Sequence, residues 1–259
     1  MDPSDSKRRL LVAIALTWAA GYVDAFGYLL LGGVYTATMS GNTVLIGVHG
    51  IAGDHSTAFL HALTVGAFVL GLVVSGAVIK LGQRRGVRRT LAFAMGLEAL
   101  CLAGLLVGTG RLLQPGSGAA ADPMWQPPLY LLVGIAAVAM GIQNTSLRMA
   151  GVLTVYTTHV TGALTRFGED AVEYLFGRRA RAGALSGAAE SGAAGPEREV
   201  RLGTVLFSSA LWGAFLIGAI AAAYATSRIG PLALLPAIAV VLVVGGLDCV
   251  APFGRPHRR

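Results

Sequence analysis

The chain has 259 residues, of which 54% are hydrophobic and only 13% are charged, and its formal net charge at pH 7 is +7. Soluble globular domains carry about 25% charged residues, so this composition excludes a disordered chain, a nucleic-acid-binding module and an ordinary soluble enzyme. It is typical of a protein that crosses the lipid bilayer several times.

Six apolar runs along the chain are long enough to cross a hydrocarbon core of about 30 Å as helices. They cover residues 10–32, 57–80, 89–109, 128–148, 204–226 and 230–250. Backbone exposed to lipid must satisfy its own hydrogen bonds, so we expect an all-α bundle of six transmembrane helices. The first run follows a basic N-terminus, as a secretory signal does. Its length and the five later runs favour an uncleaved first helix.

Basic residues lie almost entirely on one side of these spans. All of the 20 Lys and Arg except Arg111 and Arg228 fall in the two termini, the loop after the second helix and the segment after the fourth. The positive-inside rule then predicts that both termini are cytoplasmic, with residues 110–127 as an external loop and 177–200 as a flexible cytoplasmic loop. The excess of Arg over Lys indicates a bacterial gene, so we expect a bacterial inner-membrane protein.

The two halves of the chain resemble each other. The pattern Val-Tyr-Thr-x4-Gly-x5-Gly occurs at residues 34–47 and again at 155–168. Two further matches flank it, at residues 21–24 with 141–144 and at residues 66–71 with 213–218. Three matches in the same order predict a duplication.

Each repeat contains three spans, so the second repeat enters the membrane from the opposite side. We expect one membrane domain over residues 1–259, with repeat 1 at about 10–109 and repeat 2 at about 128–252. Many secondary transporters have such inverted repeats and bind substrate between them near the membrane midplane. Alternatively, the duplication records only how a six-helix protein arose.

Residues 33–50 and 152–168 are rich in Thr and Gly and too polar for ordinary spans. They are predicted to be re-entrant or broken helices with Gly41 and Gly162 at the breaks, whose free backbone groups can bind a solute. Amphipathic surface helices or ordinary loops are the alternative. Small residues recur at every fourth position in residues 67–75 and 214–222, a spacing that predicts close helix packing.

Four short motifs carry a resemblance to a known family. They are Gly-Tyr-Val-Asp-Ala at residues 21–25, Ser-Gly-Asn-Thr at 40–43, Gln143-Asn144, and Thr-Thr-His-Val-Thr-Gly at 157–162. From about residue 10 to 252 the chain resembles the YoaK-like family of bacterial multi-pass membrane proteins, a domain-of-unknown-function family. The family commonly has Thr where this chain has Ser40, which leaves a hydroxyl in place. The resemblance implies the membrane class and the paired motifs, and it implies no substrate.

Ionisable groups inside spans are costly and are functional candidates. Asp24 in the first helix is the main one, because a buried carboxylate can load and release a proton. Its alternative role is structural, with hydrogen bonds to Asn144 or to the Thr-rich segments. His159 is a candidate proton relay or anion ligand, or else a structural histidine. Glu98 in the third helix is a second-tier candidate.

Asn42, Gln143 and Asn144 would complete the binding or coupling site with neutral donors and acceptors, which suit a small polar solute or an ion. Three histidines near the external face, His49, His55 and His61, give only a weak metal signal, and we predict no metal, no cofactor and no catalytic residue. No enzyme motif is present. The sequence thus predicts a secondary transporter or permease of a small polar solute or ion, with proton coupling through Asp24 as one option. A membrane scaffold or sensor that acts with a partner is the alternative. Besides the lipid bilayer, the sequence indicates no partner and no oligomeric state.

Overall fold

The computed structural model describes residues 3–87, 89–112, 127–149, 162, 164–165, 167–169, 172 and 202–252. Every regular element within these residues is a helix, which confirms the all-α prediction. The chain divides into two compact units, Met1–Thr158 with Ala214–Arg259 and His159–Gly213. The contacts described below all lie within the first unit.

The described helices follow the predicted runs with small shifts at their ends. They are α1 (Pro3–Leu30), α2 (Met39–Ile51), α3 (His55–Arg84), α4 (Thr90–Leu112), α5 (Pro127–Met149), α7 (Leu202–Ile229), the short 3-10 helix η1 (Gly230–Leu234) and α8 (Leu235–Val250). Five stretches of the described residues are long and apolar enough to cross a membrane. Four belong to α1, α3, α4 and α5, and the fifth, Val205–Val250, covers most of α7 together with η1 and α8.

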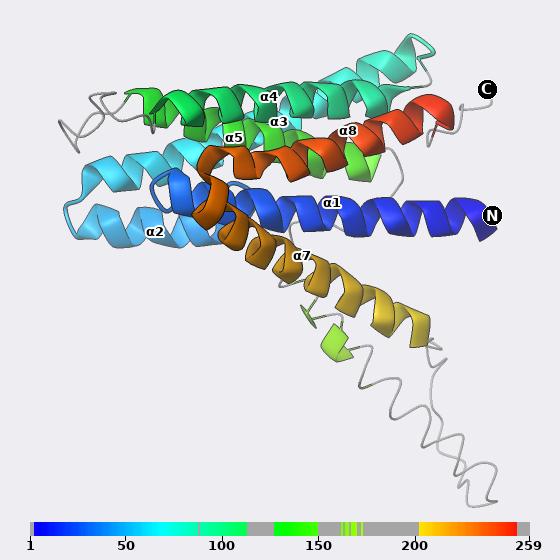
Figure 1. The fold of residues 1–259 in the computed structure, drawn as a ribbon, viewed down its shortest axis with the longest axis horizontal. Helices are drawn as coiled ribbons and strands as arrows, with labels where there is room; N and C mark the ends of the chain where they lie inside the picture. The colour runs from blue at the N-terminus through cyan, green and yellow to red at the C-terminus, as the bar shows by residue number, and fades with distance from the viewer. Residues whose placement is uncertain are drawn as a thin grey trace, which may run out of the picture. The chain divides into compact units, whose positions relative to one another are not determined.

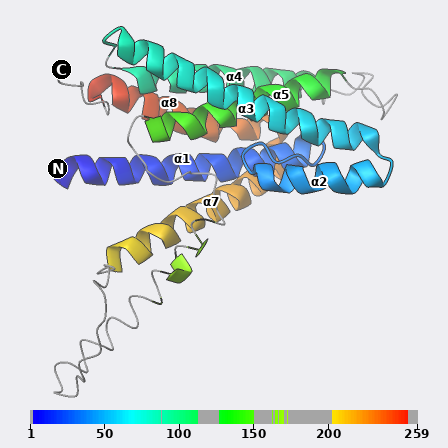
Figure 2. The ribbon, with the colours of Figure 1, turned by 180° about the vertical axis from the view of Figure 1, so that it is seen from behind.

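Helices α1, α3, α4, α5 and α8 lie roughly side by side along a common direction (Figures 1 and 2). Helix α5 packs against α3 and α4, and α8 packs against α4 and α1. The shared core consists of apolar side chains such as Leu16, Phe26, Met95, Leu102 and Met140. Large apolar side chains also cover the outside, among them Val73, Phe93, Leu100 and Leu242, each more than half exposed. A surface this apolar suits lipid rather than water.

The predicted small-residue packing is confirmed where α3 meets α5. A Cβ added to Gly71 would collide with the Val138 carbonyl oxygen, and one added to Gly141 would collide with the Phe68 carbonyl oxygen. Only glycine lets two backbones approach this closely. The crossing of α3 and α5 therefore depends on both glycines.

Helices α1 and α7 cross in the same way. A Cβ on Gly21 would collide with the Phe215 carbonyl oxygen, and one on Gly218 would collide with the Trp18 carbonyl oxygen. The repeat matches Gly21 with Gly141, Gly218 with Gly71, and Phe215 with Phe68. The two crossings are thus made by corresponding residues of the two halves.

The interruption after the first helix lies upstream of the predicted position. Residues 31–38 are not helical, and they join α1 to α2 (Figure 2). Gly32 and Gly33 have φ values of 76° and 78°, which side chains other than glycine rarely adopt. The prediction of a break at Gly41 is therefore wrong. Gly41 is the third residue of α2, where it makes room for the Tyr35 ring.

The second predicted interruption, residues 152–168, falls mostly outside the described residues. Gly162 itself is helical, as are its described neighbours Leu164 and Thr165. A break at Gly162 is therefore not observed. His159 lies outside the described residues, and an interruption before Gly162 stays a prediction.

Candidate functional site

The side chain of Asp24 in α1 is buried and holds the residues that interrupt the helix. Its Oδ1 accepts a hydrogen bond from the Ala37 N–H at 2.7 Å, and its Oδ2 accepts one from the Thr38 hydroxyl at 2.6 Å. Longer bonds of 3.4 Å come from the Thr36 hydroxyl and the Thr38 N–H. Among the described residues, the hydrogen-bond partners of this carboxyl all lie in residues 36–38. Asn144 does not contribute one, and the donors come from the Thr-rich segment, the other partner that the structural alternative names.

The position of Asp24 matches the electrostatics of α2. Thr38 directly precedes α2 and is its N-cap residue, and its own side chain makes no capping hydrogen bond. The first N–H groups of a helix lack partners within the helix, and the helix dipole favours negative charge there. The Asp24 carboxylate supplies both the acceptor and the charge. One buried carboxylate thereby fixes where α2 begins.

Asn42 of α2 also binds the non-helical segment between α1 and α2. Its Oδ1 accepts a hydrogen bond from the Tyr35 N–H at 3.1 Å, and its Nδ2 donates to the Tyr35 carbonyl. The Asn42 Oδ1 also lies 3.0 Å from Nδ1 of His61 in α3. An amide oxygen can only accept, so the His61 N–H donates. The predicted residues Asp24 and Asn42 are therefore brought together by residues 35–38.

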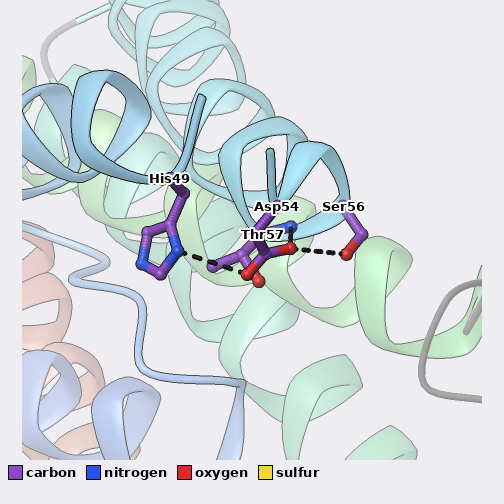
Figure 3. Close-up of polar contacts among 4 residues, drawn as sticks. All are labelled: His49, Asp54, Ser56 and Thr57. Carbon is purple, nitrogen blue, oxygen red and sulfur yellow. Dashed lines mark hydrogen bonds and ion pairs between the residues drawn. The ribbon is translucent and has the colours of Figure 1, made fainter. Parts of the chain in front are cut away.

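A polar cluster of His49, Asp54, Ser56 and Thr57 lies at the turn between α2 and α3 (Figure 3). The rings of His61 and His49 stack with 5.8 Å between their centroids, and the His49 Nδ1 lies 3.2 Å from the Asp54 Oδ2. Asp54 is the N-cap residue of α3. Hydrogen bonds from the Thr57 side chain, the Thr57 N–H and the Ser56 hydroxyl lower the pKa of Asp54 to about 2, and His49 adds a smaller effect.

Gln143 lies at a different depth from Asp24. Its Nε2 donates a hydrogen bond of 2.7 Å to the carbonyl of Leu16 in α1. Leu16 is eight residues before Asp24 in the same helix, which is about 12 Å along its axis. Asn144 is buried beside Gln143 in α5. The described residues of the predicted site therefore lie in two separate polar clusters, one around Asp24 and Asn42 and one around Gln143 and Asn144.

Glu98 in α4 is completely buried. Neither carboxylate oxygen has a hydrogen-bond partner among the described residues. Other buried oxygen atoms in the described part of the chain share this condition with it, among them the Thr17 hydroxyl, the Oε1 of Gln143 and the Thr226 hydroxyl. A polar group without a hydrogen-bond partner in an apolar core costs free energy, so these unpaired oxygen atoms require an explanation.

Within the described ranges, no three His, Cys, Asp or Glu side chains are placed to hold a metal ion. A surface hollow of about 270 Å³ lies where α3 ends and α4 begins, and none of the predicted site residues lines it. Its lining is Val78, Leu81, Gly82, Arg85, Val87, Thr90 and Phe93.

Comparison with known proteins gives the family. Residues 12–247 match the model of a family described as "Protein of unknown function (DUF1275)". The chain belongs to this family. It is 29% identical over 177 residues to the UPF0700 transmembrane protein YoaK of Bacillus subtilis (strain 168), and the match covers 68% of this chain and 72% of that protein. No solved structure matches the chain. The chain is therefore a multi-pass membrane protein of the YoaK-like family, as the sequence motifs indicate.

Several residues that contact the predicted site residues were not predicted from the sequence. Thr38 and Tyr35 bind Asp24 and Asn42, and His61 joins them from α3. Thr17 in α1 was also missed. Its signal was available, because it is a polar residue within an apolar run that faces the core. The partners of Asn42 had no signal, because they depend on how α2 folds back against α3.

Proposed function

We propose that this protein is a secondary transporter of a small polar solute or ion. The observation that carries the proposal is a buried carboxylate, Asp24, that holds the interruption between α1 and α2. Broken helices whose half-helix ends meet polar groups recur at the binding sites of secondary transporters. A helical bundle with a purely structural role would be more stable with a continuous helix than with an interrupted one.

The proposed architecture is six transmembrane helices in two inverted three-helix repeats. Support comes from the two glycine crossings, Gly71 with Gly141 and Gly218 with Gly21. Each crossing joins the first predicted span of one repeat to the second predicted span of the other. An exchange of this kind is what a two-fold axis in the membrane plane would generate.

The proposed location is the bacterial inner membrane with both termini in the cytoplasm. The start of α1 and the end of α8 lie together, because Arg8 donates hydrogen bonds to the carbonyl oxygens of Leu247 and Ala251. Arg at the end of a helix also satisfies its dipole. The predominance of basic residues at this end supports a cytoplasmic position.

The proposed mechanism uses the two protonation states of Asp24. The carboxylate accepts hydrogen bonds from the Ala37 N–H and the Thr38 hydroxyl on different oxygens. When a proton binds, the protonated oxygen becomes a donor, and the bond that this oxygen accepted is weakened. Residues 31–38 are then released from α1. A proton would thereby be coupled to movement of α2.

The remaining predicted residues are assigned to the second repeat by correspondence. The offset of 121 residues matches His159 with Thr38, and Asn144 corresponds to Asp24. We therefore propose that Asn144 and His159 are the second repeat's contributions to the path of the solute. Asn42 and Gln143 supply neutral polar groups to the path of the solute. The solute is a small polar molecule or an ion.

Proteoliposomes containing entrapped pyranine test the coupling role. After an outward pH gradient is imposed, wild-type protein should dissipate it faster than protein-free liposomes do, in the presence of a defined mixture of amino acids, sugars, Na⁺ and K⁺. Asp24→Asn should reduce this rate to the protein-free level. The matched control Asp54→Asn changes a partly exposed acidic residue outside residues 31–38 and should retain the wild-type rate. Equal rates for wild type and Asp24→Asn would remove Asp24 from the coupling role.

A membrane scaffold or sensor is the second candidate. It is favoured by the complete hydrogen bonding of the Asp24 carboxyl and the Asn42 amide. A carrier must break these bonds in each cycle, whereas a scaffold keeps them. A wild-type protein that dissipates no gradient with any component of the mixture would favour the scaffold.

A further inference from the structure

No described residue neutralises the negative charge that the Glu98 side chain carries when it is ionised. It lies near the middle of α4, fully buried, and its two oxygens have no hydrogen-bond partner in the described part of the chain. An ionised carboxylate in a low-dielectric interior is strongly unfavourable unless a cation or several donors accompany it. A bound cation would remove this cost.

Two oxygen atoms without partners lie at the depth of Glu98. Helices α4 and α5 are antiparallel, and Gly108 of α4 packs against Leu132 of α5. Glu98 lies ten residues before Gly108 in α4, and Ile142 lies ten residues after Leu132 in α5. Because the two helices are antiparallel, Glu98 is level with Ile142 and the adjacent Gln143. The Oε1 of Gln143 is buried and has no hydrogen-bond partner among the described residues.

The third member of this group comes from α1. The Gln143 Nε2 donates to the Leu16 carbonyl, which brings the amide to the level of Leu16 and the next residue, Thr17. The Thr17 hydroxyl is buried and likewise lacks a partner within the described residues. Three helices therefore bring unsatisfied oxygen atoms to one depth of the bundle.

Among the described residues, no basic side chain forms a hydrogen bond or ion pair with Glu98. In the described parts of α4, α5 and α8, the basic residues lie only in the last turns, as Arg111 and Arg148. Those of α1 are residues 7–9, which precede Leu16 by at least seven positions, about 10 Å. Lys80 of α3 is exposed.

Besides Glu98, the buried or half-buried acidic and thiol groups among the described side chains of α1, α4, α5 and α8 are Asp24, Cys101 and Asp248. Asp24 is bound to residues 36–38, and Asp248 accepts a hydrogen bond from the Ala92 N–H near the start of α4. Cys101 is half-buried, one turn beyond Glu98. None of these groups brings positive charge to Glu98.

We propose that Glu98, Gln143 and Thr17 form a buried binding site for a small monovalent cation, a proton or a sodium ion. Carboxylate, amide and hydroxyl oxygens are hard ligands that can replace the hydration of such an ion. One carboxylate balances one positive charge, whereas a divalent ion would leave a net charge in the apolar core. The site would supply the coupling ion of the proposed transporter. That role rests on the proposed function, but binding does not.

Infrared difference spectroscopy of the protein in lipid nanodiscs, with and without Na⁺, tests the site. If a proton occupies it, the C=O stretch of a protonated carboxylic acid is present near neutral pH in wild type and absent in Glu98→Gln. If sodium occupies it, Na⁺ but not choline removes that band or raises the thermal unfolding temperature. Glu98→Gln should lose either response.

Two further variants keep the test independent of folding. Gln143→Leu should weaken Na⁺ binding, or the resistance of the acid band to alkaline pH, by about 10- to 100-fold. Thr109→Val alters a buried hydroxyl that bonds within α4 to the Leu105 carbonyl, so it should retain the wild-type response. A wild-type protein with neither the acid band nor a sodium response would overturn the proposal. Cation binding without any flux would instead refute only the transport function.

Discussion

Gly71 of α3 and Gly141 of α5 are in backbone contact. A Cβ on Gly141 would lie 2.9 Å from the Gly71 Cα, and a Cβ on Gly71 would lie 3.0 Å from the Gly141 Cα. These distances leave no room for any side chain at either position. The next polar contact in the same pair of helices, between the hydroxyls of Ser75 and Ser146 at 2.9 Å, depends on this close approach.

We expect Gly71→Ala to destabilise the protein by about 1–3 kcal/mol, because the added methyl group must push α3 and α5 apart. The measurement is thermal or denaturant-induced unfolding of the purified protein in detergent. The matched control is Gly66→Ala in the same helix, where an added Cβ would meet no atom within 4 Å. Since Ala is the better helix former by about 1 kcal/mol, the control should be neutral or stabilising.

The same substitution at Gly218 tests the equivalence of the two crossings. Gly218→Ala should destabilise the protein about as much as Gly71→Ala does, because its Cβ would collide with the Trp18 carbonyl. Gly246→Ala in α8 is the control, since its Cβ would meet open space. A Gly218→Ala variant as stable as wild type would contradict the close approach of α1 and α7.

Thr38→Val should destabilise the segment between α1 and α2. The Thr38 hydroxyl is the one described partner of the Asp24 Oδ2, so its loss leaves a buried carboxylate oxygen without a donor. The expected cost is about 1–3 kcal/mol of unfolding free energy. Thr43→Val is the control, because the exposed Thr43 hydroxyl only bonds to the Met39 carbonyl within α2. Equal unfolding midpoints for the two variants would show that Asp24 does not depend on Thr38.

The Asp54 carboxylate should make stability depend on pH under acidic conditions. Its pKa is lowered from 3.8 to about 2 in the folded protein, first by hydrogen bonding from Thr57. The folded state therefore binds this proton less readily than the unfolded state does, and the stabilisation is present above pH 3.8 and is lost as the pH falls towards 2.

Circular-dichroism melting curves between pH 6 and pH 2 measure this effect. The difference in unfolding temperature between wild type and Asp54→Asn should shrink as the pH falls through that window. Ser56→Ala removes a weaker contributor and should show a smaller difference. A difference that stays constant with pH would contradict the assigned pKa.

Tyr22→Phe should loosen the connection between α1 and η1. The buried Tyr22 hydroxyl donates a hydrogen bond of 2.6 Å to the Ala233 carbonyl, and the substitution leaves that carbonyl without this donor. The expected cost is about 1 kcal/mol in unfolding experiments. Tyr224→Phe, at an exposed position, should be neutral. Hydrogen exchange should also increase near Ala233 in Tyr22→Phe alone, and an unchanged exchange rate there would contradict the prediction.

The sequence alone determined the class of the protein and the course of most helices. Long apolar runs must be helical in lipid, because backbone groups have no other partners there. The spacing of small residues around Gly71 and Gly218 also predicted where helices pack closely, since that spacing places them on one helix face. Family membership followed from short motifs that need no knowledge of contacts.

The tertiary structure decided the position of the break and the partners of the polar residues. Gly41 was a reasonable candidate for the break, but backbone conformation assigns that role to Gly32 and Gly33. Asp24 and Gln143 both looked like parts of one site, yet they bind different elements about 12 Å apart in depth. A sequence gives the chemical type of each side chain and its helix face. Which groups meet depends on how helices distant in the chain are aligned along the bundle, and only packing fixes that alignment.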